Sequence, residues 1–188
     1  MKFIFTLAII LFSIPFYAQQ NCDYSANVTD SIGTYKATKE YMIAEKNFGG
    51  TSDYFFFSLA LTDNIPTLIL QHIQKSKEFM KASCFDKTSK LYLQLANGKI
   101  VTLHHIDQEN CGTLLRDDKG FDNRVNSGNF YIIKDNFEDL KQSPVTMIRI
   151  KYATNTEDYV LKKQFTSELT SQVYYPESYF INFIKCIE

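Results

Sequence analysis

The segment Lys90-Leu-Tyr-Leu-Gln-Leu-Ala-Asn-Gly-Lys-Ile-Val-Thr-Leu-His104 decides the fold class of this chain. Residues 90–95 and 99–104 are strand-like runs, and the dipeptide Asn97-Gly98 between them is the preferred sequence of a type I′ hairpin turn. A two-residue turn fixes the register, so we expect three facing pairs: Leu95 with Ile100, Leu93 with Thr102, and Leu91 with His104. One face of this antiparallel hairpin is therefore predicted to be buried: Leu91, Leu93, Leu95 and Ile100.

Alternation with a period of two also occurs outside this hairpin. In residues 54–61 one face is fully apolar, which is typical of a covered strand near the centre of a sheet: Phe55, Phe57, Leu59 and Leu61. Further strands are predicted at 35–45, 67–73, 130–133 and 145–152, while 75–81 and 159–165 are ambiguous between strand and helix. The polar stretch 116–129 exceeds the usual length of a connection, so we interpret it as a loop.

Two short helices are predicted. Asp135 followed by Glu138 has the spacing of a capping box, and Pro144 ends the helix that begins there. The strands at 130–133 and 145–152 could then pair in parallel around this helix, although the connection is tight. Pro176 fits the first position of a last helix. The fold class is α+β: a single domain with a mostly antiparallel β-sheet packed by one or two helices, including a C-terminal helix.

The composition is that of a chain that forms a core. Its 188 residues are 45% hydrophobic and 15% aromatic, with 7 Gly and 4 Pro, which excludes a disordered or collagen-like protein. The 20 Lys and Arg against 21 Asp and Glu leave a formal net charge of −1. A chain so close to neutral has no overall field that attracts nucleic acid or acidic membranes, so we expect no nucleic-acid partner.

Residues 1–18 have the pattern of a secretory signal peptide. Lys2 gives a positive start, residues 3–12 are almost entirely apolar, and Pro15 breaks this run before Ala18. The run is too short to span a bilayer unaided, since a spanning helix needs about 20 residues. An uncleaved anchor is nevertheless an alternative, because Phe16 stands where a small residue usually precedes the cleavage site.

A lipoprotein acylated at Cys22 is a second alternative, but Gln19-Gln20-Asn21 lacks the small residues expected before such a cysteine. We therefore expect residues 19–188 to form one exported α+β domain. Its location would be the periplasm, the cell surface or the extracellular space, without stable membrane insertion after signal cleavage.

All four cysteines follow the predicted signal peptide: Cys22, Cys84, Cys111 and Cys186. An even number in an exported chain favours disulfides, whereas zinc sites need close pairs such as C-x-x-C, which are absent from the sequence. Free structural thiols are the other alternative. The hairpin register, continued outward, places Cys84 opposite Cys111. We therefore favour that bridge together with Cys22–Cys186, which would join the two ends of the mature chain.

The sequence predicts no catalytic, cofactor-binding or metal residues. His104 and His105 are adjacent on a predicted strand, so they point to opposite faces, with His104 on the leucine face. His72 has no partner that the sequence identifies. There is no G-x-S-x-G motif and no phosphate-binding glycine loop, and oxidised cysteines supply no thiolate.

One group of hard oxygen ligands occurs in the polar stretch: Asp117, Asp118, Asp122 and Asn123. Calcium is the single cofactor that this chemistry suggests, although the EF-hand pattern is not matched and solvated turn residues are the alternative. Rings that could bind sugar are the Tyr174-Tyr175 pair, Tyr152 and Tyr159, but we interpret the aromatic residues mainly as core. A modest basic stretch is interpreted as a solvated face: Lys75, Lys77, Lys81, Lys87 and Lys90.

Two short patterns match glycosylation sites. Asn27-Val28-Thr29 fits the N-glycosylation acceptor. Asp30-Ser31-Ile32 resembles a short O-glycosylation motif of some Gram-negative bacteria. Both patterns are short enough to arise by chance.

Several segments resemble those of small exported proteins of Bacteroidetes-type bacteria. They are the signal end Ala18-Gln19, the run from Cys84-Phe-Asp-Lys-Thr-Ser-Lys90 into Leu-Tyr-Leu-Gln-Leu-Ala-Asn-Gly98, Phe137-Glu-Asp-Leu-Lys141, and Met147-Ile-Arg-Ile150. They cover less than a third of the chain, and none is a catalytic motif. The resemblance implies export and carries no activity with it.

Three functional hypotheses follow. The first is a non-catalytic exported module that binds a ligand or protein partner at the periplasm or cell surface, because a core and disulfides occur without a catalytic constellation. The second is an inhibitor or immunity-type protein with one dedicated partner. The third is an enzyme whose site is assembled from distant residues, which would require His104 or His105 to meet a carboxylate in a pocket.

Overall fold

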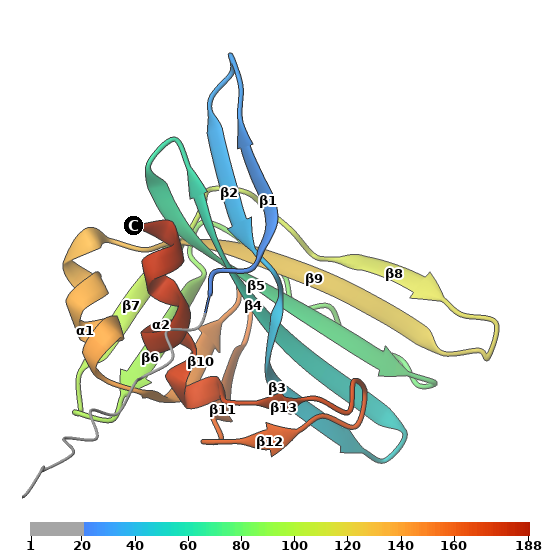
Figure 1. The fold of residues 1–188 in the computed structure, drawn as a ribbon. Helices are drawn as coiled ribbons and strands as arrows, with labels where there is room; N and C mark the ends of the chain where they lie inside the picture. Colours follow the sequence, from blue (N-terminus) through green and yellow to red (C-terminus); the bar gives the residue numbers. More distant parts are fainter. Residues whose placement is uncertain (1–20) are drawn as a thin grey trace, which may run out of the picture.

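The alternating apolar segments form long antiparallel strands in a computed structural model, which describes residues 21–188. The expected signal peptide at residues 1–18 lies outside this range. Figure 1 shows the strands and helices, which are β1 (Tyr24–Thr29), β2 (Thr34–Thr38), β3 (Tyr41–Phe48), β4 (Thr51–Thr62), β5 (Ile65–Ser76), β6 (Lys90–Leu95), β7 (Ile100–His105), β8 (Thr113–Arg116), β9 (Asp122–Tyr131), α1 (Phe137–Gln142), β10 (Val145–Lys151), β11 (Thr156–Val160), β12 (Phe165–Thr166), β13 (Val173–Tyr174) and α2 (Tyr179–Phe183). Short 3-10 turns flank the helices at Lys134–Asn136, Pro176–Ser178 and Ile184–Ile187.

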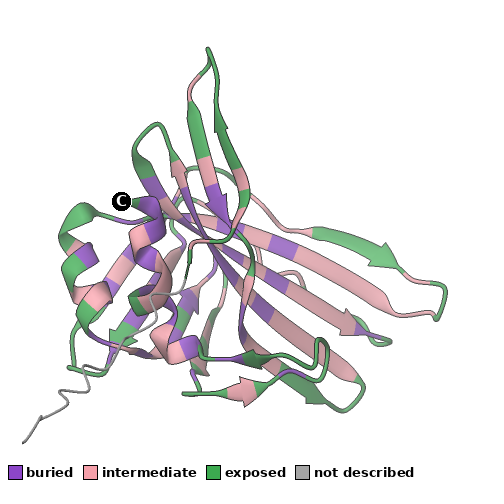
Figure 2. Cartoon of the chain, in the orientation of Figure 1, coloured by how far each residue is buried: buried purple, intermediate pink, exposed green. Residues whose placement is uncertain are grey.

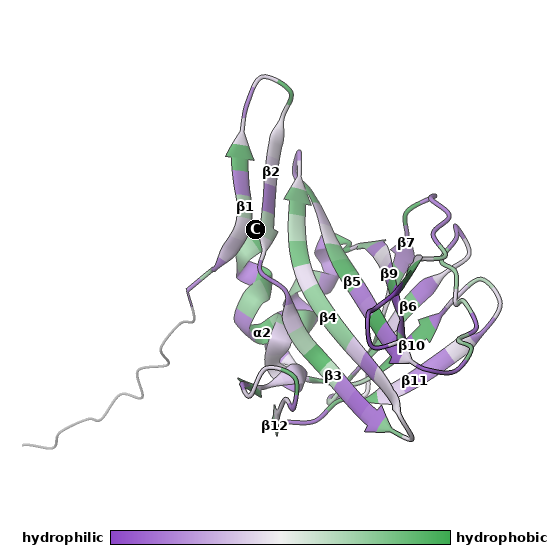
Figure 3. Cartoon of the chain, turned by 90° about the vertical axis from the view of Figure 1, so that its right-hand side faces the viewer, coloured by the Kyte–Doolittle hydropathy of each residue, from purple (hydrophilic) through white to green (hydrophobic). Residues whose placement is uncertain are grey.

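One antiparallel sheet contains the first eleven strands, and β12 and β13 form a separate ribbon. The strand order is β1-β2-β4-β5-β9-β7-β6-β10-β11, with β3 paired to the first part of β4 and β8 to the first part of β9. The far end of β4 pairs with β2 instead, and the far end of β9 pairs with β7. Because each of these long strands changes partner along its length, the sheet divides and curves (Figure 3).

The long β4–β5 hairpin forms the centre of the sheet. Its register runs from Thr62 opposite Ile65 to Ser52 opposite Lys75. Asp63 and Asn64 make the turn with φ angles of 47° and 64°, which is the left-handed backbone of a type I′ turn that Asp and Asn tolerate. The predicted alternation is confirmed, since the β4 residues on the inner face are buried: Phe55, Phe57 and Leu59.

The predicted hairpin at 90–104 is present as β6 and β7, but the predicted register was wrong by one residue. Leu91 faces Leu103, and Leu93 faces Val101. The loop has three residues, closed by the Gly98 N–H donating to the Leu95 carbonyl at 3.0 Å. Gly98 has φ +86°, as required where a type I turn is followed by a glycine bulge.

This shift turns every side chain of β7 to the other face. Ile100, expected in the core, is 63% exposed, while Val101 and Leu103 are buried opposite the leucines of β6. The buried face of the hairpin therefore consists of Leu91, Leu93, Leu95, Val101 and Leu103.

The polar stretch 116–129 is not a loop. It contains the end of β8, a short turn and most of β9. β9 is a polar strand, yet it pairs with β5 over ten residues, from Thr67 opposite Tyr131 to Ser76 opposite Asp122. Pairing on both sides gives hydrogen-bond partners to the backbone N–H and C=O groups of β9. The strand therefore needs no alternating apolar side chains, and periodicity does not reveal it.

Three smaller expectations also need correction. The predicted strand 35–45 is two strands, β2 and β3, separated at Lys39 and Glu40. The strands on either side of α1 do not pair in parallel, because β7 and β6 lie between β9 and β10. The capping box is not formed either, since Asn136 occupies the N-cap of α1 and makes no side-chain cap hydrogen bond.

The core lies on the concave side of the sheet, and the helices cover one end of it (Figure 2). Pro176 begins the last helical segment, as predicted. The buried face of that segment packs against Phe57 of β4 through Tyr179 and Phe180. Burial of each such side chain stabilises the fold by about 1.5–3 kcal/mol. The protein is a single α+β domain, and within residues 21–188 no helix has the length and apolar character needed to cross a bilayer.

Two disulfides cross-link the domain. Cys22 is bonded to Cys186 with Cα atoms 5.6 Å apart, and Cys84 is bonded to Cys111 with Cα atoms 4.0 Å apart. The second bridge follows an isolated antiparallel pair, in which Phe85 and Asn110 exchange backbone hydrogen bonds of 2.7 and 3.0 Å. These are the pairs that the sequence favours. Two disulfides indicate an oxidising, exported environment.

Candidate functional site

A network of titratable side chains lies inside the curve of the sheet, at the end away from the helices. His72 on β5 is central to it, because both of its ring nitrogens have partners. Nε2 is 3.0 Å from Asp53 Oδ1, and Nδ1 is 3.3 Å from the Tyr152 hydroxyl. The Asp53 carboxylate can only accept, so Nε2–H donates to it; in the neutral ring Nδ1 then accepts the Tyr152 O–H. Gln74 donates a second hydrogen bond to Asp53 Oδ1 at 3.0 Å.

The ring of His72 is enclosed by its surroundings. The imidazole is 3% exposed and stacks on the Phe55 ring with centroids 4.0 Å apart. Burial raises the pKa of Asp53, but hydrogen bonds from His72 and Gln74 outweigh it, and the pKa lies below its ordinary value. Burial also raises the pKa of Tyr152. Because both ring nitrogens already have protein partners and the ring is buried, the arrangement orients side chains and leaves no free nitrogen on His72.

A second set of polar groups continues this network towards β11. Tyr159 donates a hydrogen bond to Glu157. The pKa of Tyr159 is raised mainly by burial and secondly by the Glu157 carboxylate. Asn155 donates to Glu157 at 2.8 Å and to Ser83 at 3.3 Å. The Oδ1 atoms of Asn155 and of the buried Asn126 have no protein partner. Such enclosed, unpaired acceptors are the usual partners of internal water.

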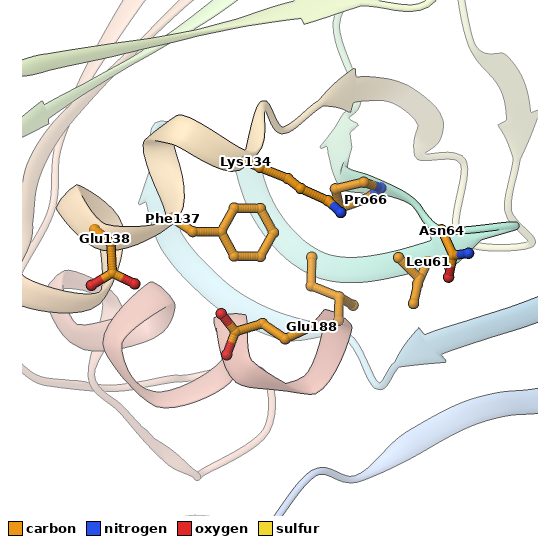
Figure 4. Close-up of a pocket in the computed structure, with 8 residues that line it drawn as sticks. Leu61, Asn64, Pro66, Lys134, Phe137, Glu138 and Glu188 are labelled. Carbon is orange, nitrogen blue, oxygen red and sulfur yellow. The ribbon is translucent and has the colours of Figure 1, made fainter.

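A cavity that is open to solvent lies at the opposite end, beside the helices (Figure 4). Its volume is about 430 Å³, within the range of small-ligand sites. The walls come from the β4–β5 turn, the start of α1 and the last helical turn, and the lining residues are Leu61, Asn64, Pro66, Lys134, Phe137, Glu138, Ile187 and Glu188.

Local sequence explains the apolar floor of this cavity. Phe137 and Ile187 are core residues, and Pro66 is buried at the start of β5. The Phe137 ring points into the hollow from the first turn of α1 (Figure 4). Pro66 is the second residue of β5, close to the strand start where the missing backbone N–H of a proline is best tolerated.

Charges of opposite sign stand on opposite sides of the Phe137 ring (Figure 4). Lys134 extends over Pro66 on one side, and within residues 21–188 it makes no ion pair. Glu138 and Glu188 lie on the other side, and Lys141 pairs with both. Hydrogen bonds to Glu188 and Glu138 raise the pKa of Lys141. One lysine against two carboxylates leaves the second side net negative, so the cavity is dipolar.

His104 and His105, which the enzyme hypothesis names, do not line the cavity. His104 is exposed on the outer face, and His105 is buried on the leucine face, which reverses the expected orientation as a consequence of the shifted register. His105 stacks on Phe85 with centroids 5.3 Å apart, and burial lowers its pKa. Within residues 21–188, neither His104 nor His105 forms an ion pair or hydrogen bond with a carboxylate, which the enzyme hypothesis required, whereas His72 does.

The acidic group of the β8–β9 turn is occupied by protein partners. Asp117 accepts hydrogen bonds from the Lys119, Phe121 and Asn123 nitrogens and pairs with Lys75 at 2.9 Å. The pKa of Asp117 lies below its ordinary value, mainly because Lys75 donates to it and secondly because the Phe121 N–H does. Asp122 Oδ1 lies 3.9 Å from Arg116 Nε. Within residues 21–188, no three His, Cys, Asp or Glu side chains are arranged to hold a metal ion.

The tyrosines considered for sugar binding are divided between core and surface. Tyr174 is buried between Tyr41 and Phe165, whereas Tyr175 is half exposed. Tyr152 belongs to the His72 network. The structure therefore does not bring these rings together on one surface.

Sequence analysis missed both the His72 network and the cavity. The sequence did contain one signal for the His72 network. If Asp63 and Asn64 are taken as a two-residue turn, the register of the hairpin pairs Phe55 with His72 and Asp53 with Gln74. Nothing in the sequence brings Lys134, Glu188 and Pro66 together, because they are remote along the chain. No protein-family model matches the chain, no curated protein is similar to it, and no solved structure matches its fold. The resemblance to exported proteins remains a prediction.

Proposed function

We propose that this chain is an exported, non-catalytic binding module of the periplasm or cell surface, whose ligand site is the helix-end cavity. The ligand class is a small amphiphilic zwitterion, such as an amino acid with an apolar side chain. The observation that carries this proposal is the separation of Lys134 from Glu138 and Glu188 across the Phe137 ring.

Each part of such a ligand has a complementary group. A carboxylate would bind the unpaired Lys134 ammonium, and an ammonium would bind the net negative Glu138–Lys141–Glu188 group. An apolar side chain would cover Phe137 and Ile187. Each charge-assisted hydrogen bond contributes about 1.5–3 kcal/mol when water is partly excluded. Neither charge activates a nucleophile, and both ring nitrogens of His72 already have protein partners, which supports binding over catalysis.

Calorimetric titration of the mature chain with three probes tests this function. L-phenylalanine carries both charges, phenethylamine carries only the ammonium, and 3-phenylpropanoate carries only the carboxylate. We expect L-phenylalanine to bind about tenfold more tightly than either fragment. Equal affinities for the three probes, or no heat with any of them, would overturn the proposal.

Charge-removing variants assign each end of the ligand. Lys134→Gln should reduce the affinity for L-phenylalanine to that for phenethylamine, while leaving phenethylamine binding unchanged. Glu138→Gln with Glu188→Gln should weaken L-phenylalanine and phenethylamine but spare 3-phenylpropanoate. Lys163→Gln, which removes an exposed lysine outside the cavity, is the matched control and should bind as the wild type does.

A further inference from the structure

The outer face of β7, β6, β10 and β11 changes from apolar to basic along the strands. Antiparallel partners share a face of the sheet, so the three strand pairings align the outward side chains in rows across it. The first row, mainly apolar, is Ile100, Gln94, Met147 and Val160; the second is Thr102, Tyr92, Arg149 and Asp158; the third, mainly basic, is His104, Lys90, Lys151 and Thr156.

An open hollow in this face, the outer-face hollow, follows the same gradient. Its volume is about 430 Å³, within the range of small-ligand sites, and members of all three rows line it: Ile100, Gln94, Met147, Tyr92, Arg149, Lys151 and Thr156. The first and third rows are four residues apart along each strand, roughly 14 Å at the usual rise. Ile100 is 63% exposed, so the apolar end of the hollow is accessible to a ligand.

The basic row is not compensated within the protein. Lys90 lies directly opposite Lys151 on one side and His104 on the other, and like charges in facing positions destabilise a sheet. The three rows contain one carboxylate, Asp158, and Arg149 donates two hydrogen bonds of 2.6 Å to it. Within residues 21–188, Lys90 and Lys151 form no ion pair.

The carboxylates of neighbouring segments leave these two lysines free. Asp86 accepts hydrogen bonds within its own turn before β6. Glu157 alternates to the other face of β11, where Tyr159 donates to it. Asp107 and Glu109, in the segment after β7, do not line the hollow. Two ammonium groups are therefore available to an anion.

We infer that the outer-face hollow binds an amphiphilic organic anion, a single apolar chain that ends in a sulfate, phosphate or carboxylate group. The apolar chain would cover Ile100, Met147 and the Tyr92 ring, and the anionic group would lie between Lys90 and Lys151. An anion at that place replaces a repulsion by two charge-assisted hydrogen bonds. A neutral amphiphile would gain the apolar contact alone, and a cation would be repelled.

Calorimetric titration with three probes of equal chain length, kept below micelle-forming concentrations, tests the inference. Octyl sulfate is anionic, octyl glucoside is neutral and octyltrimethylammonium is cationic. We expect one octyl sulfate per chain, bound about tenfold more tightly than octyl glucoside, and no binding of the cation. Equal affinities for the three probes, no binding of octyl sulfate, or binding only above the micelle-forming concentration would overturn the inference.

The unfolding temperature shows which state of the chain the probe binds. A ligand of the folded protein raises the midpoint of thermal unfolding. We therefore expect octyl sulfate to raise it, and a lowered midpoint would show that the probe binds the unfolded chain and would refute the site.

Substitutions separate the two ends of the hollow. Lys151→Gln should reduce the affinity for octyl sulfate several-fold and leave octyl glucoside unchanged. It should also raise the unfolding midpoint of the ligand-free protein by about 1–3 °C, because Lys90 loses a like charge opposite it. Lys119→Gln, which removes an exposed lysine in the β8–β9 turn, is the matched control and should change neither quantity. An equal loss of affinity in both variants would contradict the site.

The apolar end has its own variant and control. Ile100→Ser should weaken octyl sulfate and octyl glucoside alike, whereas Ile32→Ser, at a position that is 93% exposed in the β1–β2 turn, should weaken neither. A dimer of the wild type that Ile100→Ser dissociates would show that a second copy covers this face, and would refute ligand binding. The outer-face hollow shares no lining residue with the helix-end cavity, so either site can fail without the other.

Discussion

Asp53 Oδ1 accepts a hydrogen bond from Nε2 of His72 at 3.0 Å, between neighbouring strands and 19 positions apart in the chain. The register of the β4–β5 hairpin places both side chains on the concave face, where Phe55 stacks on the imidazole. Nδ1 of His72 in turn forms a hydrogen bond of 3.3 Å with the hydroxyl of Tyr152, which lies on the far side of the core. The pair therefore joins the two halves of the curved sheet, and we assign it a structural role.

Asp53→Asn should destabilise the fold by about 1–3 kcal/mol at pH 7, because a buried hydrogen-bonded carboxylate is lost and Gln74 keeps only a neutral acceptor. The folded-state pKa of Asp53 is lower than its ordinary value of 3.8. Its contribution is therefore complete well above pH 3.8 and disappears as the pH falls through the folded pKa. Urea unfolding of wild type and variant at pH 7 and pH 3 measures both effects.

The control for this change is Asp23→Asn, which removes an exposed carboxylate whose ion pair with Lys39 is on the surface. Surface pairs contribute about 1 kcal/mol at most. A destabilisation by Asp53→Asn no larger than that of Asp23→Asn would contradict a structural role for the His72 pair.

His105→Leu should reduce the dependence of stability on acid. Burial lowers the folded-state pKa of His105 below its ordinary value of 6.5, so below pH 6.5 the unfolded chain binds a proton that the folded chain does not. Wild-type stability should therefore fall between pH 7 and pH 5, by at most about 2 kcal/mol from this group, and the variant should lack that part. The free energy of unfolding of both proteins, measured from pH 7 to pH 5, checks this. An equal loss of stability in wild type and variant would show that His105 is not buried as a neutral ring.

Gly98→Ala should destabilise the β6–β7 hairpin by about 1 kcal/mol, because Gly98 has φ +86°. A β-carbon at this position would have no neighbour within 4 Å, so the cost is conformational rather than steric. Gly98→Asn should cost less, since asparagine tolerates this backbone. Thermal unfolding of both variants checks the order. A more stable alanine variant would argue against the three-residue loop.

Gly128→Ala should destabilise by about 1–3 kcal/mol through overpacking. A β-carbon at this position of β9 would lie 2.9 Å from the Phe130 ring and 3.0 Å from the Phe85 ring. Asn129→Ala, on the opposite face of the same strand, is the control and should change stability by less than about 0.5 kcal/mol. Chemical unfolding that ranks the two variants in the reverse order would contradict the described packing of Phe85.

Removal of each disulfide should lower stability according to the length of the loop it closes. In the chain-entropy model, replacing Cys22 and Cys186 by serine costs up to about 5 kcal/mol, and replacing Cys84 and Cys111 costs up to about 3.5 kcal/mol, because the sequence separations are 164 and 27. Urea unfolding ranks the two double variants.

The intact mass of the secreted protein, with and without reduction, tests both the cleavage after Ala18 and the number of disulfides. Four free thiols would contradict both bridges.

Local periodicity accounts for much of the fold that could be predicted. The Phe55, Phe57 and Leu59 face, the leucine face of β6 and the helix that begins at Pro176 follow from residue type and spacing. The pairing of Cys84 with Cys111 was also correct, although the hairpin register used to reach it was not. The two cysteines still face each other because the neighbouring pair, Phe85 with Asn110, is offset by one residue from the β6–β7 ladder.

Turn geometry and long-range pairing account for what could not be predicted. Asn97-Gly98 is compatible with a two-residue turn or with a three-residue loop, and the choice decides whether His104 or His105 is buried. β9 has no apolar period, and only hydrogen bonding to β5 and its other neighbours makes it a strand.

The sequence by itself determined the fold class, the even cysteine set, the core faces of β4 and β6, and the expectation of export. Only the tertiary structure decided which polar residues meet, namely Asp53 with His72, and Lys134 across Phe137 from Glu138 and Glu188. The physical reason is that alternation fixes the face on which a side chain lies, whereas its partners depend on register, sheet order and curvature. Those properties are set by hydrogen bonds and packing between segments that are remote in the sequence.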